Sequence, residues 1–267
     1  MRRAFHLARR PAGLSLLCGC FLLVFSTVAV AELTRDGDVV ASFVGGLTPK
    51  SLPRDRAVPV IVRVAGRIKA LRGTQLPQLR KIFVAINKAG QLDDKGLPAC
   101  RVASIQPATE DAAKRQCARS IIGDGEVTLV VRLPSQDPYV SRNRLLAFNG
   151  PSRHGVKLIL AQVYSINPPG SIILTFKVRK HRGLYGHVIE TELPSYAQGW
   201  AYLTRFELNL GRIFKVHGKR HSYVSASCAA PAGFPGALFP FGKATYVFGS
   251  GQVLTTKISR TCKVAGD

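Results

Sequence analysis

The sequence is short of acidic residues, and it lacks the motifs that mark the common catalytic sites. Only 15 Asp and Glu residues stand against 38 Lys and Arg residues, which gives a formal net charge of +23. The signatures of zinc proteases, serine hydrolases with a nucleophile elbow, P-loop proteins and EF-hands are all missing. The motif-defined members of these classes are therefore excluded. A site assembled from distant residues stays open, because a catalytic triad is defined by geometry and not by chain order.

Long hydrophobic runs are also scarce, with one exception near the N-terminus. Four arginines lie in the first ten residues, an apolar run extends from Leu14 to Val28, and Ala29-Val30-Ala31 precedes Glu32. A positive flank, an apolar core and a small-residue site are typical of a secretory signal peptide. An uncleaved membrane anchor is the alternative, because the run is just long enough to span a bilayer. We therefore expect residues 1–31 to be a signal peptide, the protein to be secreted or in the cell envelope, and no transmembrane segment to remain.

Cysteine is infrequent, and its placement agrees with export. Two of the six cysteines fall inside the signal segment, and four remain, at positions 100, 117, 228 and 262. An even number in an exported chain indicates disulfides, and the absence of C-x-x-C spacing argues against zinc. Of the three pairings, we expect Cys100–Cys117 and Cys228–Cys262, because each closes a short local loop.

Apolar residues make up 46% of the chain, which is too much for a disordered protein, and they alternate with polar ones along most of it. Such alternation predicts half-buried antiparallel strands. Candidate strands lie at 57–64, 126–133, 171–179, Lys81–Asn87, Val156–Tyr164, His187–Leu193, Tyr202–Leu210, Ile213–His217, Tyr223–Cys228, Thr245–Phe248 and Val253–Val264. The Gly249-Ser250-Gly251 stretch predicts a hairpin loop between the last two.

The pattern predicts an all-β protein with an antiparallel β-sandwich architecture and one short helix. The helix is expected from Glu110 to Arg119, with Thr109 as its N-terminal cap. A change in composition near residue 153 predicts two sandwich-like units, 32–153 with the first disulfide and 154–267 with the second. A single large sandwich is the alternative.

Two local groups invite a metal assignment, and neither fits one well. His217 and His221 lie four residues apart, but the cations around them oppose a divalent ion. Asp93 and Asp94 lack the ligand spacing of a calcium loop. We therefore expect no metal ligands, no cofactor and no catalytic residues.

Aromatic residues form one short stripe, at Trp200, Tyr202 and Phe206, with Leu208 and Leu210 continuing it. Aromatic stripes bind sugars in some proteins, but filling of the core is the more frequent role. We expect these side chains to share one face of a strand and to pack in the core.

Basic residues gather in two dense clusters in the C-terminal half of the chain and in one looser cluster at Arg67–Arg72. The residues that we expect to bind anions are Lys177, Arg179, Lys180, Arg182, Lys215, Lys219 and Arg220. A field of this sign attracts polyanions. For an exported protein, the expected partner is an anionic envelope polymer or an acidic polysaccharide, and genomic nucleic acid is not expected. Basic residues that only keep strand edges soluble are the alternative.

Several motifs together resemble an uncharacterised family of bacterial exported proteins. They are Gly96-Leu-Pro-Ala-Cys100, Cys117 with Gly123-Asp-Gly125, the segment 218–231 around Cys228, Gly233-Phe-Pro-Gly, and Cys262-Lys-Val264. The resemblance covers most of the chain after residue 31. It implies a β-rich, disulfide-containing fold and no known activity.

The sequence thus predicts a non-catalytic binding or structural protein of the cell envelope that contacts anionic polymers through basic hairpins. The alternatives are a secreted hydrolase with a site assembled from distant residues, and a structural partner of another exported protein. The sequence gives no indication of the oligomeric state.

Overall fold

The computed structural model describes residues 32–73, 75–167, 169–194 and 199–265, so the predicted signal segment lies outside the described residues. The chain is mostly β, with 62% strand and 7% helix, as predicted. Among the described residues, no helix is long and apolar enough to cross a membrane.

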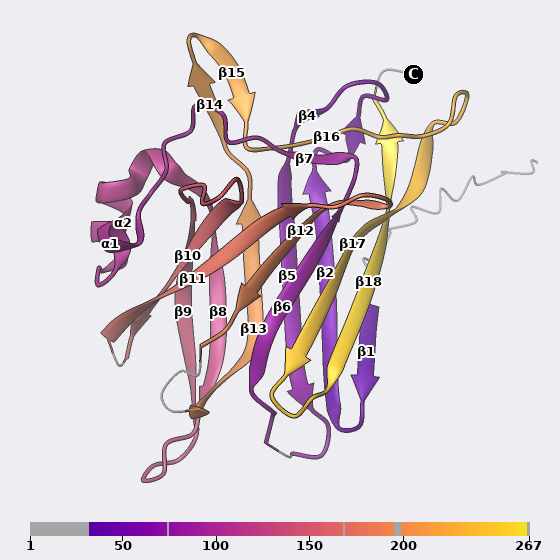
Figure 1. The fold of residues 1–267 in the computed structure, drawn as a ribbon. Coiled ribbons are helices and arrows are strands. Elements are labelled where there is room, and N and C mark those ends of the chain that lie inside the picture. Colours follow the sequence, from indigo (N-terminus) through magenta and orange to yellow (C-terminus); the bar gives the residue numbers. More distant parts are fainter. Residues whose placement is uncertain (1–31, 74, 168, 195–198, 266–267) are drawn as a thin grey trace, which may run out of the picture.

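Thirteen strands form one strongly curled sheet, shaped like a half-barrel (Figure 1). Neighbours are antiparallel, except that β3 runs parallel to β18. The spatial order is β1 (Glu32–Asp36), β2 (Val39–Thr48), β5 (Ile61–Ala70), β13 (Ala201–Leu210), β8 (Ile121–Val131), β9 (Tyr139–Asn149), β10 (Lys157–Ile166), β11 (Pro169–Lys180), β12 (Tyr185–Glu192), β6 (Leu79–Asn87), β17 (Gly236–Phe248), β18 (Val253–Val264) and β3 (Ser51–Leu52).

The curl brings the two ends of this sheet together. The Thr34 hydroxyl on β1 donates to the carbonyl of Thr255 on β18 at 2.7 Å, and Arg260 Nε donates to the carbonyl of Gly45 on β2 at 2.7 Å. Side chains therefore join the two edges at these points, where no backbone ladder runs between β18 and β1 or β2.

Two small sheets complete the β structure. One consists of β4 (Val58–Pro59), β16 (Val224–Ala226) and β7 (Gly90–Leu92), and it lies at one end of the curled sheet (Figure 1). Val224 and Ala226 are buried in the main apolar core, so this sheet closes that end. The other is the hairpin of β14 (Ile213–Val216) and β15 (Lys219–Ser222).

The helices cover the outer side of β9 and β10. Helix α1 (Val102–Ile105), helix α2 (Glu110–Cys117) and the 3-10 turn η1 (Ala118–Ser120) follow one another. Ile105 and Cys117 pack with Phe148 and Leu160 in a small separate core. The predicted cap is confirmed, because the Thr109 hydroxyl accepts a hydrogen bond from the amide of Ala112 at 3.2 Å.

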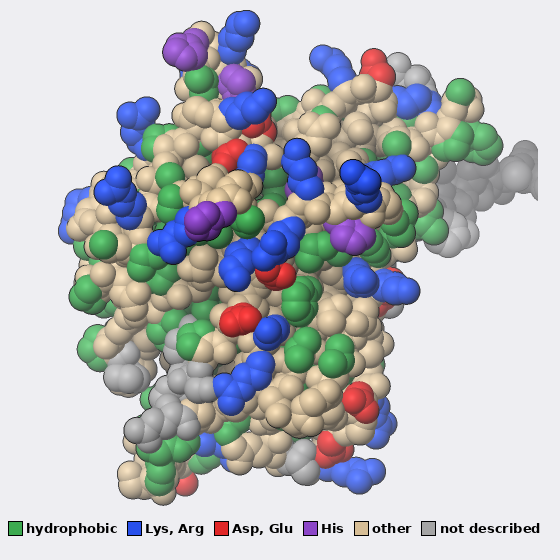
Figure 2. Space-filling model, viewed as in Figure 1, with side chains coloured by type: hydrophobic (Ala, Val, Ile, Leu, Met, Phe, Trp, Pro, Cys, Tyr) green, Lys and Arg blue, Asp and Glu red, His purple; other side chains and the backbone are tan. Residues whose placement is uncertain are grey.

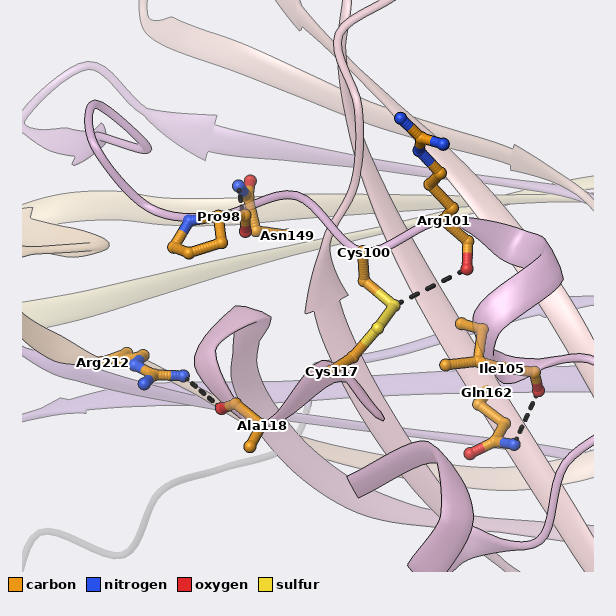
Figure 3. Close-up of a disulfide and its surroundings, with 9 residues drawn as sticks. All are labelled: Pro98, Cys100, Arg101, Ile105, Cys117, Ala118, Asn149, Gln162 and Arg212. Atoms are coloured by element: carbon orange, nitrogen blue, oxygen red, sulfur yellow. Dashed lines mark hydrogen bonds between the residues drawn. A yellow bond between two sulfur atoms is a disulfide. The ribbon is translucent and has the colours of Figure 1, made fainter. Parts of the chain in front are cut away.

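Both expected disulfides are confirmed. Cys100–Cys117 has a Cα–Cα distance of 5.6 Å and joins α2 to the loop before α1, as Figure 3 shows. Cys228–Cys262 has a Cα–Cα distance of 5.7 Å and joins the segment after β16 to β18.

The expected sandwich arrangement differs from the sheet that forms. Strands from before and after residue 153 interleave: β13 lies between β5 and β8, and β6 lies between β12 and β17. The result is one curled sheet that does not clearly separate into two sandwich units. The division into 32–153 and 154–267 stays a prediction.

Candidate functional site

A polar groove of about 660 Å³ lies on the outer side of β5, β13, β8 and β9. Five basic side chains line it, against two acidic ones. The basic residues are Arg67, Lys69, Arg132, Arg142 and Arg205, and the acidic ones are Glu126 and Glu207. Pairing in the sheet brings these residues together from segments up to 138 positions apart, since Arg67 and Arg205 are ladder partners.

The strand register sets three of the arginines in one row across the sheet. Arg67 on β5 is opposite Arg205 on β13, Arg205 is opposite Thr128 on β8, and Thr128 is opposite Arg142 on β9. Residues in register project from the same face of a sheet, and adjacent strands lie about 4.8 Å apart. The row from Arg67 to Arg142 therefore spans about 14 Å.

The two carboxylates of the groove are already engaged by cations. Glu207 pairs with Arg63 and, at 3.3 Å, with Arg205, and Glu126 pairs with Arg144 at 3.3 Å. The other four cations of the groove, Arg67, Lys69, Arg132 and Arg142, are exposed and form no ion pair within the described part of the chain. The groove therefore has a surplus of positive charge that no acidic side chain among the described residues balances.

A bulge in β13 determines which of its side chains face this groove, and it overturns one prediction. The register shifts between Leu203 and Arg205, with Thr204 as the extra residue. Tyr202 consequently lines the outer groove, whereas Phe206 lines the apolar interior. The expected common face of Tyr202 and Phe206 is wrong, because one inserted residue reverses the alternation of a strand.

The predicted anion-binding residues of the first cluster lie along β11 and the loop after it, away from the groove. Arg179 Nε is 2.9 Å from Glu190 Oε1, so this cation is already paired. Lys177 is opposite Glu190 in the ladder and lowers the pKa of Glu192, after the stronger effect of Lys81. Lys180 and Arg182 are exposed at the end of the hairpin.

The second cluster forms the β14–β15 hairpin, which projects from the sheet (Figure 1). Lys215 is opposite Arg220, and Lys219 follows the His217-Gly218 turn. Both turn residues have positive φ, 47° and 77°, as a tight two-residue hairpin turn requires. In Figure 2, basic side chains spread from this hairpin over the face of β10, β11 and β12, with few acidic ones among them.

Two acid–base contacts attach the hairpin and the strand β10 to the loop after β7. Lys157 at the start of β10 pairs with Asp94, and His221 Nδ1 on β15 is 3.8 Å from Asp93 Oδ2. The two aspartates that invite a calcium assignment thus face Lys157 and His221. His221 stacks on Phe214 with ring centroids 5.7 Å apart, whereas His217 occupies the turn. Within the described residues, no group of three His, Cys, Asp or Glu side chains could hold a metal ion.

Sequence reasoning missed most of the groove. It noted the loose cluster at Arg67–Arg72, but Arg132 and Arg205 are isolated in the sequence and Arg142 has only Arg144 nearby. Their only signal is an outward position on an apolar strand. That signal becomes informative once the order of the strands is known.

No known protein family matches the chain, and no curated protein or solved structure is significantly similar to it. The motif resemblance to a bacterial exported family is thus supported only in its coarser content, a β-rich chain with two disulfides. The two disulfides also hint at an oxidising location outside the cytoplasm.

Proposed function

We propose that this protein is a non-catalytic binding protein of the cell envelope that holds an acidic polysaccharide along the outer groove. The observation that carries the proposal is the cross-strand row of Arg67, Arg205 and Arg142, with Lys69 and Arg132 beside it. Arginine suits this role because its planar guanidinium binds carboxylate and phosphate oxygens through two parallel hydrogen bonds.

The shape of the groove favours a linear ligand over a small anion. A single small anion would contact one or two of these cations, whereas the row is about 14 Å long. A chain with repeated charges would contact several of them at once, and each contact would release counterions.

The wall of the groove favours a sugar chain over single-stranded nucleic acid. Binding of bases requires exposed aromatic faces for stacking. Among the described residues, the one aromatic side chain that lines the groove is Tyr202, which is 7% exposed and accepts a hydrogen bond from Gln75.

The β14–β15 hairpin supports a second, weaker contact. Lys215, Lys219 and Arg220 lie beyond the C-terminal end of β13, whereas Arg205 lies in the middle of this strand. A long polymer that lies along the outer groove could extend to the hairpin, and a short one would not reach it.

Three variants, each with lysines or arginines replaced by glutamine, test the proposal. The groove variant carries Arg67→Gln, Lys69→Gln, Arg132→Gln and Arg142→Gln. The hairpin variant carries Lys215→Gln, Lys219→Gln and Arg220→Gln. The control removes four exposed cations elsewhere, with Lys95→Gln, Arg115→Gln, Lys257→Gln and Lys263→Gln.

The oxidised proteins would be passed over beads that carry alginate, neutral dextran or single-stranded DNA. We expect alginate to retain the wild type and the control at low salt, the hairpin variant less strongly, and the groove variant at least tenfold less. Equal losses in the groove variant and the control would contradict the proposal, because binding would then follow net charge alone. Stronger retention on DNA than on alginate would contradict the choice of ligand.

A further inference from the structure

The interior of the curled sheet is packed unevenly. On β2, β5, β17 and β18 the core includes a cluster of fully buried side chains, with Phe43, Ile68, Tyr246, Leu254 and Ile258 at 0–2% exposed. Between β8, β9, β10, β11 and β13 it is hollow, with a cavity of about 150 Å³.

The hollow half has an almost wholly apolar wall. Of the described residues that line the cavity, only Gln78 has a polar side chain. Ala147 and Ala161 are ladder partners on this wall, where larger side chains would fill the space. Leu129, Phe176 and Leu203 project into the cavity and stay partly exposed. Apolar wall atoms that face an empty space lose packing contacts, so an apolar occupant would be stabilised here.

The space continues along the strands. A second apolar cavity of about 100 Å³ lies under the β4–β16–β7 sheet, and both cavities are lined by Val84, Leu208 and Leu210. Along β6 the first cavity is lined by residues from Leu79 to Val84 and the second by residues from Val84 onward. Two hollows placed end to end along a strand fit a thin linear group better than a compact one.

The cavity has one polar end. Gln78 and the exposed Pro194 lie there together with Ala201, at the opposite end from the small β4–β16–β7 sheet. A cavity of about 150 Å³ with an apolar wall stays dry and accepts a molecule of the size of benzene, which has six carbons. From the size, lining and shape we propose that the interior binds the unbranched alkyl chain of a single-chain amphiphile, with its polar head at the Gln78 end.

This site is independent of the outer groove, because the two lie on opposite faces of β13 and β8. Phe206 and Leu208 line the cavity, while Arg205 and Glu207 line the groove. Failure of either proposal therefore leaves the other untouched.

The test uses 1-octanol, sodium octanoate and, as a short-chain control, sodium butyrate. We expect octanol and octanoate to raise the Tm by about 3–6 °C at ten times their Kd, and butyrate to have no effect. Octanol acting alone would show that the head must be neutral. No rise in Tm with either eight-carbon ligand would overturn the proposal.

Trp200 supplies a second readout, since it is the only tryptophan of the chain and adjoins Ala201 at the polar end. We expect 8-bromooctanoate to quench its fluorescence saturably, with octanoate competing.

Ala161→Phe should fill the cavity and weaken binding at least tenfold, whereas Ala118→Phe, at an exposed position on η1, should bind like the wild type. If Ala161→Phe fails to fold, Ala147→Leu makes a smaller change to the same wall. Unchanged affinity in a folded cavity variant would overturn the proposal.

Discussion

At the scale of single residues, His187 on β12 stands out by its surroundings. It is half-buried, its Nδ1 atom is buried with no hydrogen-bond partner in the described part of the chain, and Lys180 is its ladder partner. Burial is the main cause that lowers the pKa of His187, and the positive charges of Lys157 and Lys180 lower it further. The folded protein therefore favours the neutral imidazole.

This environment predicts a pH-dependent contribution to stability. Because the pKa of His187 is lower in the folded state than its ordinary value of 6.5, the unfolded chain binds the proton more readily. The contribution is complete above about pH 6.5 and is lost as the pH falls through the folded-state pKa. We expect the free energy of unfolding in urea to fall less between pH 7.5 and pH 5 in His187→Asn than in the wild type. Parallel pH curves for the two proteins would refute this account.

A single inserted residue in β13 also limited what could be predicted from the sequence. Alternation assigned the outward and inward positions of β13 correctly from Arg205 onward, where Phe206, Leu208 and Leu210 line the interior. Thr204 defeated the same rule, because a bulge inserts one residue and leaves no signature in composition. The site lies beside that bulge, so its wall was beyond prediction by period alone.

At the scale of elements, the helical segment is fastened to the sheet at several points. Besides the disulfide, Arg212 Nη1 donates to the carbonyls of Ala118 at 2.9 Å and Ile121 at 2.7 Å (Figure 3 shows the first). Gln162 Nε2 on β10 donates to the carbonyls of Ile105 and Ala108, each at 2.9 Å. The eight residues of α2 are too few for a stable isolated helix, so these attachments keep it in place.

Removal of the first disulfide should therefore loosen this segment. We expect Cys100→Ala with Cys117→Ala to lower the free energy of unfolding by about 3 kcal/mol, as a closed loop of this length predicts. Urea unfolding followed by circular dichroism measures the loss. Amide hydrogen exchange should show the first loss of protection in α2. A loss confined to the distant β17–β18 hairpin would be inconsistent with this role.

Most strands could be predicted from the sequence pattern, whereas β2 and β9 could not. β6, β10, β12, β13 and β18 fall within a few residues of their expected ranges. β9 was missed because Leu145–Asn149 is buried on both sides, where helices replace solvent. β2 was missed because Gly45 and Gly46 interrupt it. A Cβ atom at Gly45 would lie 2.6 Å from the Phe241 ring, so the glycine is needed for close packing.

At the scale of the whole molecule, the order of the strands controls the site. The groove exists because β13 inserts between β5 and β8, which sets Arg205 between Arg67 and Thr128. Such pairings join distant segments and depend on the packing of the complete sheet. The periodicity of a single strand carries no information about these pairings. The basic hairpins could therefore be predicted from the sequence, whereas the arginine row could not.

Calorimetric titration with a uniform alginate oligomer is the decisive measurement of whether the groove binds an acidic polymer. The affinities of the wild type, the groove variant and the control would be measured from 20 to 200 mM salt. We predict that the logarithm of the association constant falls steeply with the logarithm of salt concentration for the wild type and the control. The groove variant should bind at least tenfold more weakly, with a shallower slope. A groove variant with the affinity and the slope of the control would contradict the claim.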